Sequence, residues 1–273
     1  RSFGCQGLEA VRKARVPVIK FRDGPTKVSV DVSFNTDNGP RNSALVRRLL
    51  ARYSEARPLV LLLKWVLYNN CQNEVFYGGL GSYALVLMVV SFLQMRRRTH
   101  RAGSEDLGAL LLGFLQLYGH QFNYERVGIS VRRGGSYFVK GERGWEEIGK
   151  PYLLAIEDPD NPGLQSITKI TQFTNKQDIC VVGKKPENNV GKGTYNIMAI
   201  RALFGQLYDT LVQPTDAQSP LSAVLAVHPQ LLSYRTSVAR RYHATTTTPE
   251  EVLSDSPRAS TAAGHEDQWQ REW

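Results

Sequence analysis

The carboxylate of Asp31 is the first side chain whose type and position suggest metal chemistry. Residues 27–35 alternate apolar and polar side chains, which predicts a strand with Asp31 on its polar face. Aspartate is depleted in strands, and a carboxylate on a rigid strand suits a divalent metal ion. An ordinary solvent-facing aspartate explains the position equally well. One carboxylate cannot hold two metal ions, so a two-metal site for phosphoryl transfer needs further ligands elsewhere.

A glycine-rich segment before an apolar helix could bind phosphate. Residues 78–83 read Gly-Gly-Leu-Gly-Ser-Tyr, so Ser82 is expected to cap the helix and the helix amides could receive an anion. Tyr83 could stack on a base. A glycine turn with an ordinary cap is the simpler interpretation of the same residues, because such turns are common.

Three more polar residues have both a structural and a nucleotide-binding interpretation. Lys64 interrupts the apolar run 59–67, so its ammonium either extends to water or meets a phosphate. Asn42 and Ser43 open the first expected helix, where they could cap the helix or contact a ribose or phosphate.

Several standard catalytic patterns are absent from the sequence. Asp158 and Asp160 form a D-x-D, but Pro159 and the following Asn-Pro-Gly predict a turn, which cannot project both acids from one strand face. Residues 191–194 only approach a Walker A motif, no G-x-S-x-G occurs, and the five histidines have no metal or triad spacing. Hydrolase and zinc-enzyme functions are therefore disfavoured.

The charge distribution favours a polyanionic partner. The chain has 34 basic and 25 acidic residues, and residues 1–243 carry +13 because residues 244–273 are acidic. Basic residues gather in two groups that could follow an RNA backbone or form ordinary solvated faces: Arg96, Arg97, Arg98 and Arg101, and Arg132, Arg133, Lys140 and Arg143. Three scattered cysteines argue against a disulfide framework, and the apolar run 84–93 is too short to cross a bilayer.

Short strands followed by helices are expected to position these residues. Strands are predicted over residues 16–21 and 27–35, and helices over residues 44–54, 58–69, 82–96, 106–119 and 195–211. Residues 221–232 and 233–242 are weaker helical candidates. A hairpin over residues 128–132 and 136–140 turns at Arg133-Gly134-Gly135, where the glycines accept positive φ.

Several strings in a fixed order give the chain a specific resemblance. These strings are residues 14–21, 30–35, 38–39, 58–64, 73–79, 82–83, 122–124, 134–137 and 156–159. By them the chain resembles the noncanonical poly(A) polymerases of the topoisomerase-related-function type, in the DNA polymerase β-like nucleotidyltransferase superfamily. The resemblance covers residues 9–163 and 188–242.

The resemblance implies template-independent addition of adenylate to RNA 3′ ends. ATP would be the substrate and Mg²⁺ or Mn²⁺ the metal cofactor, activating the primer 3′-hydroxyl and stabilising the pyrophosphate leaving group. Asp31 matches the family's third metal-binding carboxylate and would be catalytic. The nucleotide-binding positions would be Asn42 and Ser43 for the ribose, Lys64 and Ser82 for the triphosphate, Tyr83 for stacking on the base, and Asp158 near the base edge.

The sequence departs from the family pattern in three ways. The Gly-Ser helix and the Asp-x-Asp pair of the family precede the matching region and are absent here, so the chain as given is expected not to polymerise. Residues 164–187 form an atypical insertion, either a retained intron or a lineage-specific loop. Uridylyl-adding relatives often carry histidine where Asn188 falls, so Asn188 favours ATP.

The expected fold class is α+β. Residues 1–40 would be the C-terminal part of a nucleotidyltransferase palm, residues 41–243 a mostly helical PAP-associated central domain, and residues 244–273 a disordered tail. The expected setting is nuclear RNA surveillance, beside an RNA helicase, a zinc-knuckle RNA-binding protein and the exosome, with no membrane. A terminal uridylyl- or mixed-nucleotide transferase and a noncatalytic RNA- or partner-binding remnant are the alternatives.

Overall fold

The computed structural model describes residues 4–12, 17–34, 38–99, 106–147, 149–160, 188–213, 221, 225, 233 and 235–240. The described residues form two compact units, one up to Ser43 together with those from 233 onward, and the other from Ala44 to Leu225. The insertion at 164–187, the tail at 244–273 and most of the helix expected at 221–232 lie outside the described residues. Residues 233 and 235–240 have helical backbone, as expected.

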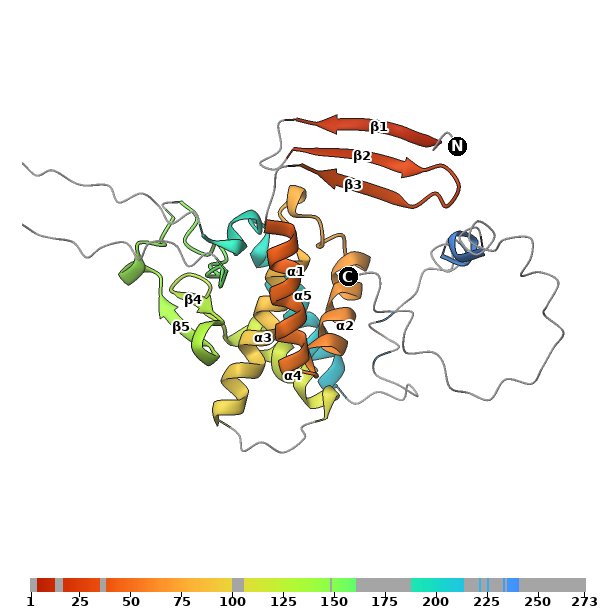
Figure 1. The fold of residues 1–273 in the computed structure, drawn as a ribbon. Coiled ribbons are helices and arrows are strands. Elements are labelled where there is room, and N and C mark those ends of the chain that lie inside the picture. The colour runs from red at the N-terminus through yellow and green to blue at the C-terminus, as the bar shows by residue number, and fades with distance from the viewer. Residues whose placement is uncertain are drawn as a thin grey trace, which may run out of the picture. The chain divides into compact units, whose positions relative to one another are not determined.

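The first unit contains an antiparallel sheet in the order β1-β2-β3 (Figure 1). Strands β2 (Val18–Asp23) and β3 (Ser29–Ser33) confirm the two predicted strands, and Asp31 is exposed between two partly buried valines. Strand β1 (Cys5–Val11) is not predicted by the sequence pattern, because its residues do not alternate and nearly all of them are exposed. A bulge between Gln6 and Glu9 breaks its register with β2.

The second unit is mostly helical, and its helices appear together in Figure 1. They are α1 (Asn38–Arg52), which begins in the first unit, α2 (Ala56–Asn69), α3 (Ser82–Thr99), α4 (Leu107–Gln116) and α5 (Ile197–Val212). The five predicted helices are therefore confirmed, with shifted ends. Helix α2 packs on α3, and α4 packs on α5.

Helix α1 begins four residues before Asn42, so the prediction that Asn42 and Ser43 open this helix is wrong. Pro40 falls in the first turn, where its missing N–H is not needed and its fixed φ suits the helix. Asn42 and Ser43 lie in the second turn, which excludes the capping role that the sequence allowed.

Helix α4 is capped by Asp106 and continues into a π-helical turn, η2 (Leu117–Gln121). The Asp106 carboxylate accepts hydrogen bonds from the amides of Gly108 and Ala109. Beyond Gln116 the wider turn brings Gly119 against α5, where a Cβ on Gly119 would lie 2.4 Å from the Gly205 nitrogen. The expected single helix over 106–119 is thus divided at the point where two backbones pack closely.

Helix α3 forms the centre of the hydrophobic core. Its residues 84–93 are at most 4% exposed, as expected for a buried core helix. Phe114 of α4 contacts the rings of Phe92, Tyr118 and Phe204, which joins α3, η2 and α5. Among the helices in the described ranges, none is long and apolar enough to cross a membrane.

A short hairpin completes the second unit (Figure 1). Strand β4 (Val127–Ser130) pairs antiparallel with β5 (Ser136–Val139), as predicted. The turn between them has positive φ at Arg133, Gly134 and Gly135, and the last two confirm the expected use of glycine there. The mixture of a separate sheet, a hairpin and a helical layer confirms the α+β fold class.

Candidate nucleotide-binding site

Tyr83 and Asp158 are joined by a hydrogen bond across 75 residues of sequence. The Tyr83 hydroxyl donates to Oδ1 of Asp158 at 3.0 Å, from the first turn of α3 to the loop after β5. Burial raises the pKa of Tyr83 far above its ordinary value, and the nearby Asp158 carboxylate raises it further. The phenol therefore stays protonated and acts as a donor, while its ring remains half-buried.

Asn188 contacts the loop that carries Asp158. The Asp158 amide donates to the Asn188 carbonyl at 3.0 Å, beside an isolated antiparallel bridge between Glu157 and Asn189. The Asn188 side chain is only 6% exposed, and its Oδ1 has no hydrogen-bond partner among the described residues. A buried acceptor without a donor is costly, which marks Asn188 as a candidate ligand contact. Three residues expected near the base are thus brought together.

Asn189 holds the loop that carries Asp158. Its Oδ1 accepts from the amides of Ile156 and Gly191 at 3.0 and 2.8 Å, and its Nδ2 donates to the Leu154 carbonyl at 3.0 Å. The side chain therefore replaces a strand partner for residues 154–156 and fixes the position of Asn188 relative to Asp158.

Lys140 supports the same loop from inside the protein. This residue is 1% exposed, and its ammonium donates to the carbonyls of Tyr124, Pro151 and Leu153. Burial lowers the pKa of Lys140 to about 8. The expectation that Lys140 belongs to a surface group following an RNA backbone is therefore wrong, because its charge is used to hold backbone carbonyls.

Arginines of the two predicted basic groups also form ion pairs within the protein. Arg132 and Arg143 lie 3.7 and 3.6 Å from the carboxylate of Glu157, whose side chain is 9% exposed. Arg97 pairs with Glu55 at 3.0 Å. Part of the positive charge counted from the sequence is therefore neutralised by nearby carboxylates. The two ion pairs with Glu157 lie directly beside the Asp158 loop.

Ser82 is the first residue of α3 rather than its cap. The first intrahelical bond runs from the Leu85 amide to the Gly81 carbonyl at 3.0 Å, so Gly81 holds the cap position expected for Ser82. Ser82 is exposed at the helix N-terminus, where the helix dipole and the amides of a first turn favour an anion.

The glycines before Ser82 are required by packing. A Cβ on Gly78 would lie 2.5 Å from the Tyr195 ring, and a Cβ on Gly79 would lie 2.5 Å from the Gln72 carbonyl oxygen. Gly78 also has a φ of 82°, which other residues rarely adopt. The simpler interpretation of this segment as a structural glycine turn therefore accounts for its composition.

Lys64 lies on the middle of α2, which packs against α3. Its side chain is half-buried, and burial lowers its pKa. A partly desolvated ammonium interacts more strongly with a phosphate than a fully hydrated one does. The position is compatible with both interpretations drawn from the sequence.

Asp31 lies on β3 in the first unit, where it pairs with a lysine across the sheet. It stands opposite Lys20 of β2, whose Nζ lies 3.5 Å from the Asp31 carboxylate, and both side chains are about half exposed. Asp31 therefore has a partner on the neighbouring strand. No cluster of three or more His, Cys, Asp or Glu side chains occurs in the described part of the chain. Asp31 alone does not fit a pair of divalent ions.

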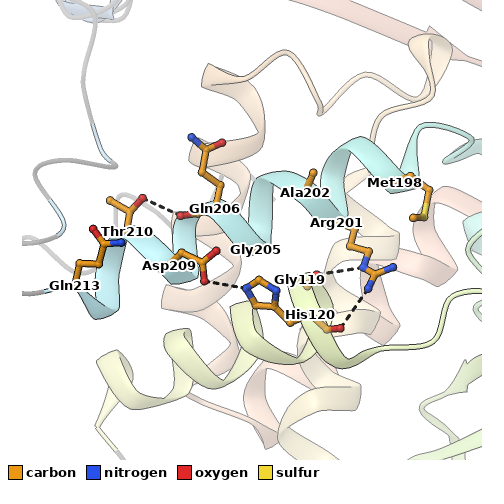
Figure 2. A pocket seen from close by; sticks show the side chains of 10 residues that line it. All are labelled: Gly119, His120, Met198, Arg201, Ala202, Gly205, Gln206, Asp209, Thr210 and Gln213. Carbon is orange, nitrogen blue, oxygen red and sulfur yellow. Dashed lines mark hydrogen bonds and ion pairs between the residues drawn. The ribbon is translucent and has the colours of Figure 1, made fainter.

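A separate cavity of about 520 Å³ lies between η2 and α5 and contains none of the expected site residues. Figure 2 shows the His120 ring pointing to Asp209, with a contact of 3.1 Å. Arg201 donates to the carbonyls of Gly119 and His120. These contacts join the π-helical turn to α5 and explain the local structure without a ligand.

Lys140, Asn189 and Glu157 are the positioning residues that sequence reasoning missed. One signal was available for Lys140. Strand alternation places it on the same side as Phe138, which is 8% exposed, so an inward direction follows from the pattern. The roles of Asn189 and Glu157 depend on contacts between distant segments and have no local signal.

Two family descriptions match the chain. "Cid1 family poly A polymerase" matches residues 106–163, and "Poly(A) RNA polymerase, mitochondrial-like, central palm domain" matches residues 1–51. The first match includes β4, β5 and Asp158, and the second includes the sheet that carries Asp31.

Curated relatives are also named as poly(A) RNA polymerases. Poly(A) RNA polymerase cid14 of Schizosaccharomyces pombe is 39% identical over 207 residues, which cover 75% of this chain and 27% of the relative. The inactive noncanonical poly(A) RNA polymerase protein Trf4-2 of Drosophila melanogaster is 32% identical over 261 residues, covering 89% of this chain and 57% of the relative. The chain spans about a quarter of the length of the first two curated relatives it matches.

Solved structures also match. The Cid1 poly(U) polymerase with Mg and 3′-dATP bound has a TM-score of 0.59 at 21% identity, covers 82% of this chain and 72% of its own, and supports the fold alone. The polymerase core of TRAMP, an RNA surveillance complex, has a TM-score of 0.65 at 30% identity, covering 82% of this chain and 67% of that chain. With the family matches and the curated relatives, this similarity establishes that the chain belongs to the noncanonical poly(A) polymerase family.

Proposed function

We propose that this chain is part of a polymerase that adds adenylate to RNA 3′ ends without a template. The observation that carries the proposal is the convergence of Tyr83, Asp158 and Asn188 in a member of this family. The amino group of adenine is a donor, whereas the corresponding oxygen of uracil is an acceptor. The buried Oδ1 of Asn188, which has no hydrogen-bond partner among the described residues, therefore suits adenine.

The other expected residues are proposed to take the roles that the family resemblance implies. Tyr83 stacks on the base, Ser82 and Lys64 bind the triphosphate, and Asn42 and Ser43 contact the ribose. The helix dipole of α3 and the partly desolvated ammonium of Lys64 both favour a polyphosphate. Asp158, near the base edge, accepts the hydrogen bond from the Tyr83 hydroxyl and keeps the Tyr83 ring oriented for stacking on the base.

The proposed domain organisation assigns residues 1–40 to a palm domain and residues 41–243 to a central domain. The palm-domain match over residues 1–51 and the division between compact units at Ser43 support it. Asp31 is proposed to supply one carboxylate of a divalent-metal site. Because the described residues contain no group of three or more His, Cys, Asp or Glu side chains that could hold a metal ion, the further ligands have to come from elsewhere in the protein.

The proposed cellular role is RNA surveillance in the nucleus. The relevant solved structure is described as the polymerase core of TRAMP, an RNA surveillance complex. From the family resemblance, we propose that an RNA helicase, a zinc-knuckle RNA-binding protein and the exosome act beside this protein.

Primer extension by the full-length protein tests the proposal. A labelled RNA primer is incubated with each of the four nucleoside triphosphates in turn, and the proposal predicts extension mainly with ATP. Extension mainly with UTP would instead identify a uridylyltransferase, and equal use of several nucleotides a mixed-nucleotide enzyme. The Asp31→Asn variant is expected to lose extension while its thermal unfolding midpoint is unchanged.

A noncatalytic RNA- or partner-binding protein is the second candidate function. Two observations favour it: the described residues contain no group of three or more His, Cys, Asp or Glu side chains that could hold a metal ion, and a similar relative is itself described as inactive. Under this alternative the full-length protein binds RNA but extends the primer with none of the four nucleotides.

A further inference from the structure

Two aromatic side chains close to the candidate nucleotide site are largely exposed. Phe76 is 82% exposed and Tyr77 is 70% exposed, both in the short helix η1 (Val75–Tyr77) that precedes α3. Their rings meet edge to face with centroids 5.1 Å apart. Large aromatic side chains are normally covered, so an exposed pair of this kind indicates a binding surface.

The turn that carries these rings is held rigidly. The amides of Tyr77 and Gly79 donate to the Glu74 carbonyl at 3.0 and 2.9 Å, and Gly78 completes the turn with a positive φ. The Tyr195 hydroxyl donates to the Phe76 carbonyl at 3.0 Å. The rings are therefore positioned before any partner binds, which lowers the entropy cost of binding.

Tyr195 and Lys150 extend this surface. Tyr195 is 49% exposed, and one edge of its ring lies against Gly78. The Lys150 ammonium is 5.8 Å from the centre of the Tyr195 ring and is itself exposed. An aromatic surface bordered by an exposed cation is suited to bind a ligand in which flat, uncharged rings are attached to an anionic backbone.

The surface is connected to the candidate site by short chain segments. Five residues lead from Tyr77 to Ser82, which limits their separation to about 18 Å of extended chain. On the other side, the Asn196 amide donates to the Gly78 carbonyl at 3.0 Å, and residues 188–196 link Asn196 to Asn188. The rings are thus within a few nucleotides of the proposed base site.

We propose that Phe76, Tyr77 and Tyr195 form a stacking surface for unpaired bases of the RNA strand, upstream of its 3′ end, with Lys150 near the phosphates. The inference rests on the proposed function, because it assumes that the strand ends at the nucleotide site. RNA is favoured over a protein partner by the flat rings, by the bordering Lys150 and by the +13 charge of residues 1–243. Stacking on these rings holds the strand without selecting its sequence.

Fluorescence anisotropy on the 273-residue chain tests the proposal, with a labelled oligoadenylate of about 12 nucleotides and no ATP or metal. The double variant Phe76→Ala/Tyr77→Ala is expected to weaken binding about tenfold, and Phe76→Trp to retain it. The matched control is Tyr68→Ala, which removes another exposed tyrosine, on α2, and is expected to have no effect.

Two results would overturn the stacking surface. One is that Phe76→Ala/Tyr77→Ala binds oligoadenylate with the affinity of the unmodified chain. This result is expected if the rings bind a protein partner, or if the chain binds no RNA. The other is an equal loss of affinity for an abasic ribose-phosphate oligomer, since an oligomer without bases cannot stack.

Calorimetric titration with ATP separates this proposal from the proposed function. The stacking surface predicts that Phe76→Ala/Tyr77→Ala binds ATP as the unmodified chain does. If ATP does not bind while RNA binding still depends on the rings, the proposed function fails and the stacking surface stands. If ATP binds and the affinity for RNA does not depend on the two rings, only the stacking surface is refuted.

Discussion

The Tyr83 hydroxyl donates a 3.0 Å hydrogen bond to the Asp158 carboxylate, joining the start of α3 to a loop 75 residues later. Asn188 reaches the same loop through the Asp158 amide. The residues proposed to contact the base are therefore connected before nucleotide binds. Such preorganisation means that little side-chain freedom is lost on binding.

The Tyr83–Asp158 bond is expected to contribute to stability as well as to orientation. A hydrogen bond to a charged group typically contributes about 1.5 to 3 kcal/mol, and the partial exposure of this pair places it near the lower end. A double-mutant cycle with Tyr83→Phe and Asp158→Asn, measured by urea unfolding, should give a coupling free energy of about 1.5 kcal/mol. Strict additivity of the two substitutions would show that the bond contributes nothing.

Lys140→Met should destabilise the protein by about 2 to 4 kcal/mol, because it leaves three backbone carbonyls without their donor. Chemical denaturation measures the change. Lys192→Met is the matched control, since Lys192 is exposed and its loss should change stability by less than about 0.5 kcal/mol. Equal effects of the two substitutions would contradict the role of Lys140 in holding the Asp158 loop.

Stability should increase with pH above the folded pKa of Lys140. Burial lowers that pKa from the ordinary 10.5 to about 8, so between these values the unfolded chain binds a proton that the folded chain has released. The free energy of unfolding therefore rises as pH increases from about 8 to 10.5. Denaturation curves at several pH values should show this rise in the unmodified chain and a smaller rise in Lys140→Met. A rise of equal size in both would assign it to other groups.

Asn188→His should shift nucleotide preference from ATP towards UTP. The substitution removes the Oδ1 that lacks a partner in the described part of the chain and suits the adenine amino group. Competition between the two nucleotides, measured as the ratio of their dissociation constants, should change by about tenfold, which corresponds to one hydrogen bond. Asn188→Asp keeps an acceptor at this position and should retain more of the ATP preference. An unchanged ratio in Asn188→His would remove this residue from base recognition.

Sequence periodicity predicts the elements that bury a regular face. The five helices and the hairpin follow from apolar spacing and from Gly134-Gly135, because core packing enforces these patterns. Strand β1 does not follow, because its exposed residues and its bulge at Gly7 leave no alternation to detect. The start of α1 is missed because Gly39 and Pro40 usually end helices, although proline is compatible with a first turn.

The candidate site is only partly predictable from sequence. Spacing singles out Ser82 and Tyr83, whereas the pairing of Tyr83 with Asp158 is a contact between distant segments that only the fold creates. The resemblance to a known family supplies Asp158 and Asn188 as base-contacting positions. Composition does not distinguish the buried Lys140 from the neighbouring arginines, and only strand alternation with Phe138 indicates that its side chain points inward.

Calorimetric titration of the 273-residue chain with ATP tests most directly the claim that Tyr83, Asp158 and Asn188 form an adenine nucleotide site. The claim predicts that Tyr83→Ala weakens ATP binding about tenfold through lost stacking, while Tyr68→Ala, on α2, leaves it unchanged. Binding of ATP by Tyr83→Ala with the affinity of the unmodified chain would contradict it.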